Sequence, residues 1–404
     1  MTGCRKLLRC LACGGGELRP VLSLGNQALA NSYRDPGDES PEPTFPLDLN
    51  RCPRCFHCQL GTAVDPDLLY RNYIYVSGTT TTLRGYFDWF ADRLAAVAPG
   101  ARSVLELACN DGTLLQILRD RGYDVAGVDP AENLRSLTLD AGLDVRCAYW
   151  TEAEAEALDR RFDVLVAMNV LAHGADPLGF LRACRRALRP GGRLFVQTSQ
   201  AFMIDRGEFD TIYHEHHSFF TTRSMQALAN RAGLRVVAAE HVPVHGTSLL
   251  FTLSLEGPDD PSLAAMLAQE ETRGLYEDAI YDRFAAAAVT VRQQLANVVA
   301  AHKRRGFRVL GYGAAAKGNT VLQFANGAGV EAMVDDNALK QGRRLPGTGL
   351  PVLPPDALTT IPDPVLHVVT AWNFRDEIVR RIQAVRPGTA DRFVAYFPDV
   401  EVFG

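Results

Sequence analysis

Short apolar runs alternate with amphipathic stretches through the middle of this 404-residue chain, from about residue 103 to residue 197. Four of the runs are RSVLELA, YDVAGVD, FDVLVAMN and GRLFVQTS. Apolar runs of this length, separated by helical patterns, predict buried parallel strands with helices between them. The apolar runs at residues 234–239 and 249–255 extend the same sheet. This part of the chain therefore predicts a doubly wound α/β fold.

A second α/β unit is predicted near the C-terminus, with strands at FRVLGYG, GVEAMVD and VLHVVTAWN and a last helix and strand. Before it, residues 262–304 contain no Pro and only Gly274, so this stretch is predicted to be largely helical. Residues 1–66 are instead rich in Cys, Pro and Gly, with an exposed loop at 33–46. These differences predict three domains, at residues 1–66, 67–258 and 259–404.

The bulk composition is that of a globular cytoplasmic enzyme, with 47% hydrophobic and 22% charged residues. A net charge of −5 argues against nucleic acid or an anionic membrane as the main partner. No apolar run approaches the roughly 20 residues that span a bilayer. The first ten residues, MTGCRKLLRC, lack the apolar core of a secretory signal. No obligatory protein partner is evident from the sequence.

Six of the nine cysteines fall within the first sixty residues, which in an intracellular chain favours metal binding over disulfides. They include two CxxC pairs, Cys10–Cys13 and Cys52–Cys55. Four such thiolates close a tetrahedral, structural zinc site, which would supply folding free energy to a segment too small for its own core. Further candidate ligands are Cys4, His57 and Cys58. The alternative is a set of reduced cysteines without metal.

The segment VLELACNDGTLL, residues 104–115, predicts a strand, a tight turn and a helix. Small residues at Ala108 and Gly112 allow a ligand to approach the backbone. Glu106, near the strand end, is placed to meet a positive amine or sulfonium. Asp129 ends the next strand and can accept hydrogen bonds from both ribose hydroxyls. A dinucleotide-binding fold shares this acidic residue, but the turn has no G-x-G-x-x-G.

The order of these motifs, with the fourth strand FDVLVAMN and the turn LRPGGRL before the fifth, resembles class I methyltransferases, which use S-adenosylmethionine. The resemblance implies a class I methyltransferase sheet. It also implies a set of cofactor-binding residues: Glu106, Ala108, Asn110, Asp111, Gly112, Leu115, Asp129, Pro130, Asn169 and Val170.

Five titratable side chains follow one another after the fifth strand, in the segment FDTIYHEHHSFF at residues 209–220. In class I methyltransferases this segment often covers the transferred methyl group. That resemblance implies that His216 is a general base, with Glu215 or Tyr213 orienting it or binding substrate. A second metal site is an alternative, although adjacent side chains diverge and the H-E-x-x-H spacing is absent. Another alternative is that these side chains have a purely structural role.

Nearly end to end, the chain resembles the three-domain C-methyltransferases of deoxysugar biosynthesis, which act on nucleotide-diphosphate sugars. Besides the motifs above, the matching segments are LGNQALAN at 24–31, YIYVSG at 73–78, NVLAH at 169–173, HGTS at 245–248, GYGAAAKGNT at 311–320 and WN at 372–373. The resemblance implies that His216 is the base beside Tyr213 and Glu215, and that His173 and Tyr75 or Tyr73 line the cleft.

Three positions depart from the family pattern: Cys109, His217 and Thr247. The family usually has a small serine or alanine at the first of these positions, an apolar residue at the second and glycine at the third. His217 adds a polar neighbour to the predicted base.

The C-terminal segment GYGAAAKG predicts a Gly-rich turn between a strand and a helix, where backbone amides and Lys317 would hold a diphosphate. Asp335, Asp336 and Asn337 end the next strand, in the position of a ribose-binding group. Gly311, Gly313 and Ala316 also fit a loose G-x-G-x-x-A pattern, so an NAD-binding oxidoreductase module stays open, as does an empty structural turn. The family resemblance implies a nucleotide-sugar site instead. The predicted substrate-binding residues are Tyr73, His245, Ser248, Gly313, Lys317, Asn319, Thr320, Asp336, Asn337, Trp372 and Asn373.

The expected reaction is C-methylation of a nucleotide-diphosphate 4-keto-deoxysugar, with thymidine diphosphate as the expected nucleotide. The sugar would bind between the middle and C-terminal domains. His216 would remove the acidic proton beside the ketone, and the enolate carbon would accept the methyl group, at C3 in the family's best-known reactions and at C5 in others. An O- or N-methyltransferase for another small metabolite and a nonenzymatic nucleotide-sugar-binding protein are the alternatives.

Overall fold

The computed structural model of the chain describes residues 3–70, 81–198, 202–242, 244, 248–362 and 364–404. The backbone forms two compact units. Unit 1 comprises Met1–Arg19, Asn50–Phe202 and Glu215–Tyr276, and unit 2 comprises Pro20–Leu49, Met203–His214 and Glu277–Gly404. Each unit is therefore built from three separate stretches, and the predicted N-terminal segment contributes to both.

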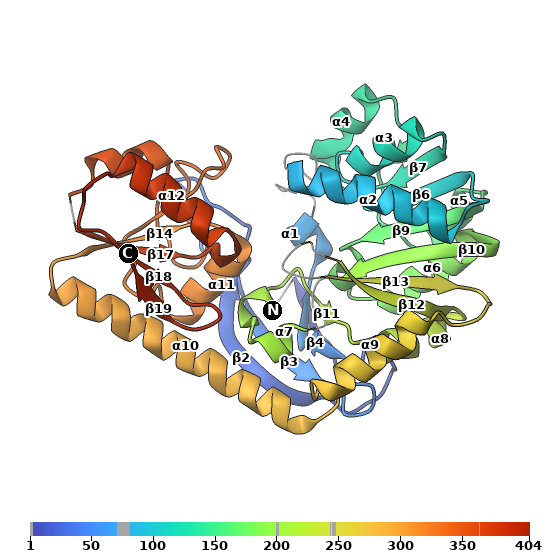
Figure 1. Cartoon of the computed structure of the whole chain (residues 1–404), viewed down its shortest axis with the longest axis horizontal. Helices are drawn as coiled ribbons and strands as arrows, with labels where there is room; N and C mark the ends of the chain where they lie inside the picture. Colours follow the sequence, from blue (N-terminus) through green and yellow to red (C-terminus); the bar gives the residue numbers. More distant parts are fainter. Residues whose placement is uncertain (1–2, 71–80, 199–201, 243, 245–247, 363) are drawn as a thin grey trace. The chain divides into compact units, whose positions relative to one another are not determined.

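A seven-stranded sheet forms the centre of unit 1, in the order β12-β13-β10-β9-β6-β7-β8 (Figure 1). The strands are β6 (Ser103–Leu107), β7 (Asp124–Val128), β8 (Val145–Arg146), β9 (Phe162–Met168), β10 (Leu188–Thr198), β12 (Arg235–Val242) and β13 (Ser248–Ser254). Strands β6 to β10 pair in parallel, whereas β13 runs antiparallel to both of its neighbours. All six predicted strands are confirmed.

The RPGG sequence is predicted to be a turn, but in the structure it lies within β10. The pairing of β10 with β9 shifts register between Leu188 and Arg193, so the strand continues past an irregularity.

Helices α2 (Thr81–Val97) and α3 (Thr113–Asp120) cover one face of this sheet. Phe90 of α2 and Leu118 of α3 form a core with Val164 and Val166, which share a face because side chains alternate along a strand. The other helices of unit 1 are α1 (Pro66–Tyr70), α4 (Arg135–Asp140), α5 (Glu152–Ala157), α6 (Pro177–Ala187), α8 (Thr222–Ala232) and α9 (Pro261–Thr272). Of these, α6 packs against α5 and α8, and α8 also packs against α9.

Four short strands complete unit 1, three from the N-terminal segment and one from the histidine segment. Strand β1 (Cys4–Lys6) pairs antiparallel with β5 (Thr62–Val64), and β4 (Cys58–Leu60) pairs antiparallel with β11 (Ser218–Phe219).

Unit 2 contains a six-stranded sheet in the order β16-β15-β14-β17-β18-β19. The strands are β14 (Arg308–Tyr312), β15 (Ala332–Val334), β16 (Val352–Leu353), β17 (Val365–Val369), β18 (Arg392–Ala395) and β19 (Glu401–Phe403). The strands pair in parallel except for β19. Its helices are α7 (Met203–Arg206), α10 (Asp278–Arg304), α11 (Ala316–Phe324) and α12 (Arg375–Val385). The predicted second α/β unit is confirmed.

The segment after residue 19 packs on α11 in unit 2, through β2 (Arg19–Ala28) and the loop that leads to β3 (Thr44–Arg51) (Figure 1). Gln27 Nε2 donates to the carbonyl oxygen of Thr320 at 3.3 Å, and Asn319 Nδ2 donates to that of Ala30 at 3.0 Å. The motif at residues 24–31 thus supports the helix that follows the Gly-rich turn.

The predicted helical stretch at 262–304 is largely helical but divides into α9 and α10. Gly274 has a φ of +73°, and the amide of Leu275 bonds back to the carbonyl of Glu270, as at a glycine-terminated helix end.

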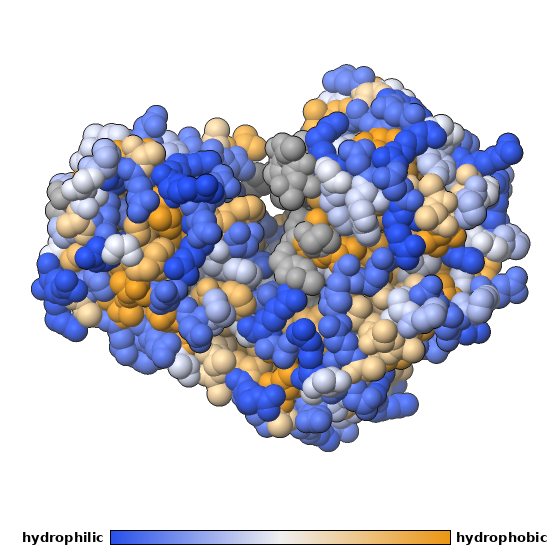
Figure 2. All heavy atoms as spheres, viewed as in Figure 1, coloured by the Kyte–Doolittle hydropathy of each residue, from blue (hydrophilic) through white to orange (hydrophobic). Residues whose placement is uncertain are grey.

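None of the helices in the described parts of the chain is long and apolar enough to cross a membrane. In Figure 2, hydrophobic residues form separate small groups among hydrophilic ones on the visible face of each unit.

Candidate functional site

The turn after β6 has an unusual backbone. Ala108, Asn110 and Gly112 all have positive φ angles, of 57°, 54° and 75°. A side chain at Gly112 would be strained, and its Cβ would lie 2.4 Å from Leu143 Cδ1. Positive φ at non-glycine residues is uncommon and concentrates at ligand-binding sites. The turn therefore has the strained, closely packed backbone expected where a ligand approaches.

Glu106 and Asp129 lie at the carboxyl ends of β6 and β7 and are only 4% and 8% exposed. Asp129 accepts hydrogen bonds from the amides of Asn110 and Ala131, both at 2.8 Å. Glu106 Oε2 is buried with no hydrogen-bond partner among the described residues. Burial, together with the nearby Asp129 and Asp111 carboxyls, raises the pKa of Glu106 well above its usual range. A cation bound beside Glu106 would stabilise its charged form. Glu106 and Asp129 are therefore suited to bind an amine and a ribose.

Asn169, at the end of β9, also has a positive φ, of 54°. Its Oδ1 accepts from Gln197 Nε2 at 3.2 Å, and Gln197 Oε1 accepts from the Tyr86 hydroxyl at 2.5 Å. This buried relay orients Asn169. Sequence reasoning missed Gln197 and Tyr86, although a glutamine inside the apolar run GRLFVQTS was a visible signal.

The remaining predicted cofactor residues have local structural contacts. Asp111 Oδ1 accepts from the amide and hydroxyl of Thr113 and so begins α3. Leu115 is fully buried against Cys109 and Leu143. The family departure at Cys109 therefore fills the core below the turn. Pro130 follows Asp129 directly, and Val170 precedes a short 3-10 turn, Leu171–His173. Direct contact of these residues with a cofactor stays a prediction.

The histidine segment divides between the two units: Tyr213 and His214 belong to unit 2, and Glu215, His216 and His217 to unit 1. His214 Nε2 donates to the carbonyl oxygen of Phe45 at 3.2 Å, and burial lowers the pKa of His214 to about 4. His214 is therefore a neutral hydrogen-bond donor inside unit 2.

In unit 1, His216 is buried and its ring centroid lies 5.1 Å from that of His173. Burial, with a smaller effect of His217, lowers the pKa of His173 to about 4. His217 Nδ1 donates to the carbonyl oxygen of His173 at 2.8 Å, which gives this family departure a positioning role. The hydroxyl of Tyr70 lies 3.1 Å from the same carbonyl and 3.0 Å from that of Glu215. Sequence reasoning missed Tyr70, which no motif marked.

Tyr73, Tyr75 and His245 lie outside the described residues, as does the departure at Thr247. Ser248 belongs to unit 1, where it is fully buried and donates to the carbonyl oxygen of Val244 at 3.0 Å.

The two CxxC pairs come together in unit 1. The sulfurs of Cys10 and Cys55 are 3.6 Å apart and those of Cys13 and Cys52 are 3.5 Å apart, and all four lie within 4.8 Å of one another. Four thiolates at a Zn–S distance of about 2.3 Å in a tetrahedron are about 3.8 Å apart, so the set fits zinc. Among the described residues it is the one group that could hold a metal, and Cys4, His57 and Cys58 are not part of it.

The Gly-rich turn of unit 2 owes its glycines to packing. A Cβ at Gly311 would lie 2.3 Å from Met333 Sδ, and one at Gly313, where φ is +98°, would lie 2.6 Å from the Cβ of Ala371. Both clashes are with protein atoms, so these glycines do not by themselves indicate a dinucleotide.

Lys317 stands in the first turn of α11, with its Nζ 5.0 Å from the centroid of the Trp372 ring. The indole N–H of Trp372 donates to Asp210 Oδ2 at 2.7 Å, and the neighbouring Asn373 lies in the same short 3-10 turn. Asn319 and Thr320 are fully buried, and the Thr320 hydroxyl donates to the carbonyl of Ala316.

The predicted ribose-binding residues follow β15. Asp336 forms an ion pair with Arg381 and accepts from the Tyr312 hydroxyl at 3.2 Å. Asn337 Oδ1 accepts from the amide of Leu339. Unit 2 thus brings Lys317 and Trp372 together. The carboxylate of Asp336 is already paired with Arg381.

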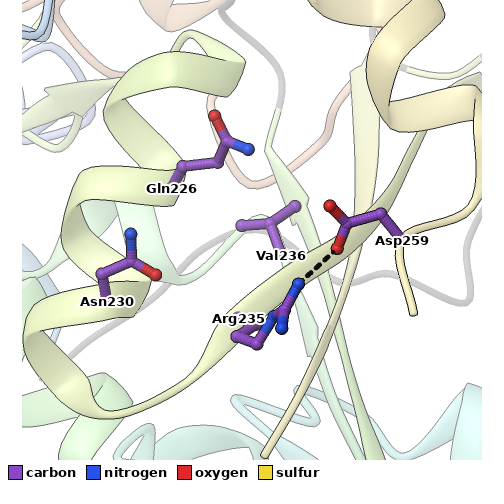
Figure 3. A pocket seen from close by; sticks show the side chains of 5 residues that line it. All are labelled: Gln226, Asn230, Arg235, Val236 and Asp259. Atoms are coloured by element: carbon purple, nitrogen blue, oxygen red, sulfur yellow. Dashed lines mark hydrogen bonds and ion pairs between the residues drawn. The ribbon is translucent and has the colours of Figure 1, made fainter. Parts of the chain in front are cut away.

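A surface depression in unit 1 is lined by Gln226, Asn230, Arg235, Val236 and Asp259 (Figure 3). Its charged side chains, Arg235 and Asp259, pair at 2.8 Å and are half exposed. No predicted site residue lines it, so it takes no part in the chemistry considered below.

Three family models match the chain: "Putative zinc binding domain" at residues 10–70, "Methyltransferase domain" at 81–239 and "C-methyltransferase C-terminal domain" at 243–398. The C-methyltransferase NovU of Streptomyces niveus is 32% identical over 93% of this chain and 92% of its own length. The chain belongs to this C-methyltransferase family. The predicted fold, a class I methyltransferase sheet with an N-terminal zinc-binding domain and a C-terminal α/β domain, is confirmed.

Three further methyltransferases each cover less than half of this chain. A ubiquinone biosynthesis O-methyltransferase of Pseudomonas entomophila is 34% identical over 28% of this chain and 49% of its own length. A solved S-adenosylmethionine-dependent methyltransferase from Clostridium acetobutylicum has a TM-score of 0.36 at 13% identity, covering 43% of this chain and 92% of its own. The glycopeptide N-methyltransferase MtfA in complex with S-adenosylmethionine has a TM-score of 0.36 at 16% identity, covering 46% and 97%.

Proposed function

We propose that this C-methyltransferase transfers a methyl group from S-adenosylmethionine to carbon in a nucleotide-diphosphate 4-keto-deoxysugar, at C3. The observation that carries the proposal is the match to a C-methyltransferase over 93% of this chain, together with the C-methyltransferase C-terminal domain model at residues 243–398. The neighbouring rings of His173 and His216 support a proton-transfer site in unit 1.

Bound S-adenosylmethionine supplies an activated methyl group on a positively charged sulfur. Glu106 would bind its amine, because the buried Oε2 of Glu106 gains a charged partner there. Asp129 would bind the ribose hydroxyls, because a carboxylate has about four lone-pair sites and can accept these bonds besides those from the Asn110 and Ala131 amides.

His216 would act as the general base. A ketone acidifies the neighbouring C–H bond, and the proton passes to the imidazole of His216 while the electron pair delocalises onto the ketone oxygen. His173 is a weak base at neutral pH, because burial keeps its pKa near 4, so it would stay neutral beside the charged His216. Tyr213 and Glu215 would orient the base or the sugar.

The diphosphate would bind at the turn before α11, where Lys317 supplies a positive charge at the helix N-terminus. The four-cysteine site would hold one structural zinc ion.

The test is incubation of the enzyme with S-adenosylmethionine and a panel of nucleotide 4-ketosugars, with the methylated position located by NMR. A product methylated at oxygen or nitrogen would replace the proposal with the alternative class of methyltransferase.

Asp129→Asn is expected to weaken S-adenosylmethionine binding by about 1–2 kcal/mol, because a charge-assisted bond to the ribose becomes neutral. Nucleotide-sugar affinity should not change. Calorimetry with both ligands measures this, with the exposed Asp120→Asn as the matched control. Equal S-adenosylmethionine affinities for wild type and Asp129→Asn would remove Asp129 from the cofactor site.

Lys317→Ala is expected to raise the KM for nucleotide sugar about tenfold, because the diphosphate loses a charged partner, while S-adenosylmethionine affinity holds. Lys303→Ala, on the half-exposed end of α10, is the control. Thermal protection by NAD or NADP, with none by thymidine diphosphate, would instead support a dinucleotide site.

A further inference from the structure

The segment that carries His216 is attached to the four-cysteine site by a two-residue strand. Strand β11 begins at Ser218 and pairs with β4, which follows the second cysteine pair closely. Ser218 stands opposite Gln59, and the amide of Leu60 donates to the carbonyl oxygen of His217 at 3.0 Å.

Gln59 joins this strand pair to the first cysteine pair. Its side chain is fully buried. Its Oε1 accepts from the amide of Leu11 at 2.8 Å, and its Nε2 donates to the carbonyl oxygen of Arg9 at 3.2 Å. Leu11 lies between Cys10 and Cys13. The backbone of Gln59 therefore pairs with β11, while its side chain holds the cysteine turn.

His57 makes a second attachment. Its Nε2 lies 3.2 Å from the hydroxyl oxygen of Ser218, and its ring centroid lies 4.8 Å from that of Phe220. His57 is fully buried and stands between Cys55 and Cys58. Gln59 and His57, which both contact β11, thus come from the residues just after the second CxxC pair.

Helix α8, which follows β11, is also attached to the four-cysteine site. Helix α8 begins directly after β11 with a capping box between Thr221 and Ser224. Near its end, Arg231 Nη1 donates to the carbonyl oxygens of Ala12 at 2.5 Å and Leu11 at 3.3 Å. The peptide units between Cys10 and Cys13 therefore bind Gln59 on β4 and Arg231 on α8.

A strand of two residues makes too few ladder bonds to hold its own register, so its position depends on these attachments. Proton transfer requires heavy-atom distances of about 2.6–3.2 Å, and a shift of about 1 Å costs about 100-fold in rate. A change at Gln59 should therefore affect the chemistry at His216 without any contact with substrate.

We propose that Gln59 is a positioning residue that fixes the His216 segment to the cysteine site. The inference rests on the proposed role of His216 in proton transfer.

The test compares Gln59→Leu with the wild type and with Gln226→Leu, a partly exposed glutamine on α8 of the same unit. Leucine keeps the volume and removes both hydrogen bonds of Gln59. The expected result is a fall in kcat of about 10- to 100-fold with unchanged S-adenosylmethionine affinity and zinc content. Hydrogen exchange at the Leu60 amide should accelerate at least tenfold. Gln226→Leu should change none of these.

Ser218→Ala is the second variant, in case Gln59→Leu fails to fold. It removes the hydroxyl beside His57 and should lower kcat severalfold and speed exchange at Leu60. Unchanged kcat and unchanged Leu60 exchange in the folded variants would overturn the proposal, as would a kcat loss that only follows loss of zinc. If the wild type methylates no ketosugar, the proposed function fails, whereas Leu60 exchange still tests the attachment.

Discussion

Replacing His216 with Asn is expected to lower methylation by about 10²–10⁴-fold, the usual contribution of a positioned general base. Asparagine keeps part of the size and hydrogen bonding of histidine but cannot accept the proton. The same variant should lose exchange of the acidic C–H of the sugar with solvent deuterium. NMR follows that exchange in the presence of S-adenosylhomocysteine and, separately, without cofactor. S-adenosylmethionine affinity, measured by calorimetry, should stay unchanged.

Tyr213→Phe is the comparison variant. It should lower the methylation rate less than His216→Asn does if Tyr213 only orients substrate. Methylation by His216→Asn at the wild-type rate would end this mechanism. The base would then be sought at His173, His214 or Tyr75. Burial keeps the pKa of His173 and His214 near 4, and His214 already binds a backbone carbonyl, so Tyr75 would become the first candidate.

Cys52→Ser is expected to remove the metal and to destabilise the protein by several kcal/mol, more than most single substitutions do. A hydroxyl is a poor replacement for a thiolate, and a bound zinc ion would supply folding free energy that the residues around the two CxxC turns cannot obtain from their own core. Elemental analysis should find about one zinc per wild-type chain and less in the variant. Thermal unfolding should begin at lower temperature.

Cys147→Ser is the control, because Cys147 is exposed and lies outside the four-cysteine group. Carefully prepared wild-type protein without zinc would contradict the assignment. So would a Cys52→Ser variant with wild-type stability.

Local chemistry explains why much of the site could be read from the chain. A strand that ends in a carboxylate places that group at the sheet edge whatever the rest of the fold does, and Glu106 and Asp129 both lie there. Two CxxC turns can share one ion only if they meet, and they do. Apolar periodicity predicted most strands of the two large sheets but not the two-residue strands β8 and β16, which are too short to show a pattern.

Other features depend on contacts between residues far apart in sequence, which no local pattern encodes. Residues 20–49 pack in unit 2 because Gln27 and the carbonyl of Ala30 bind α11, almost 300 positions away. The glycines at 311 and 313 resemble a dinucleotide fingerprint but are required by Met333 and Ala371.

The same holds for the support of the histidine segment. Its titratable residues mark it in the sequence, but Tyr70 and Gln59, which bind its backbone or hold its partner strand, belong to no motif. Residue type and spacing therefore predict which groups would do the chemistry, because reactivity belongs to single side chains. The partners that hold those groups in place follow from packing of the whole chain, since buried donors and acceptors pair with whatever the fold brings beside them.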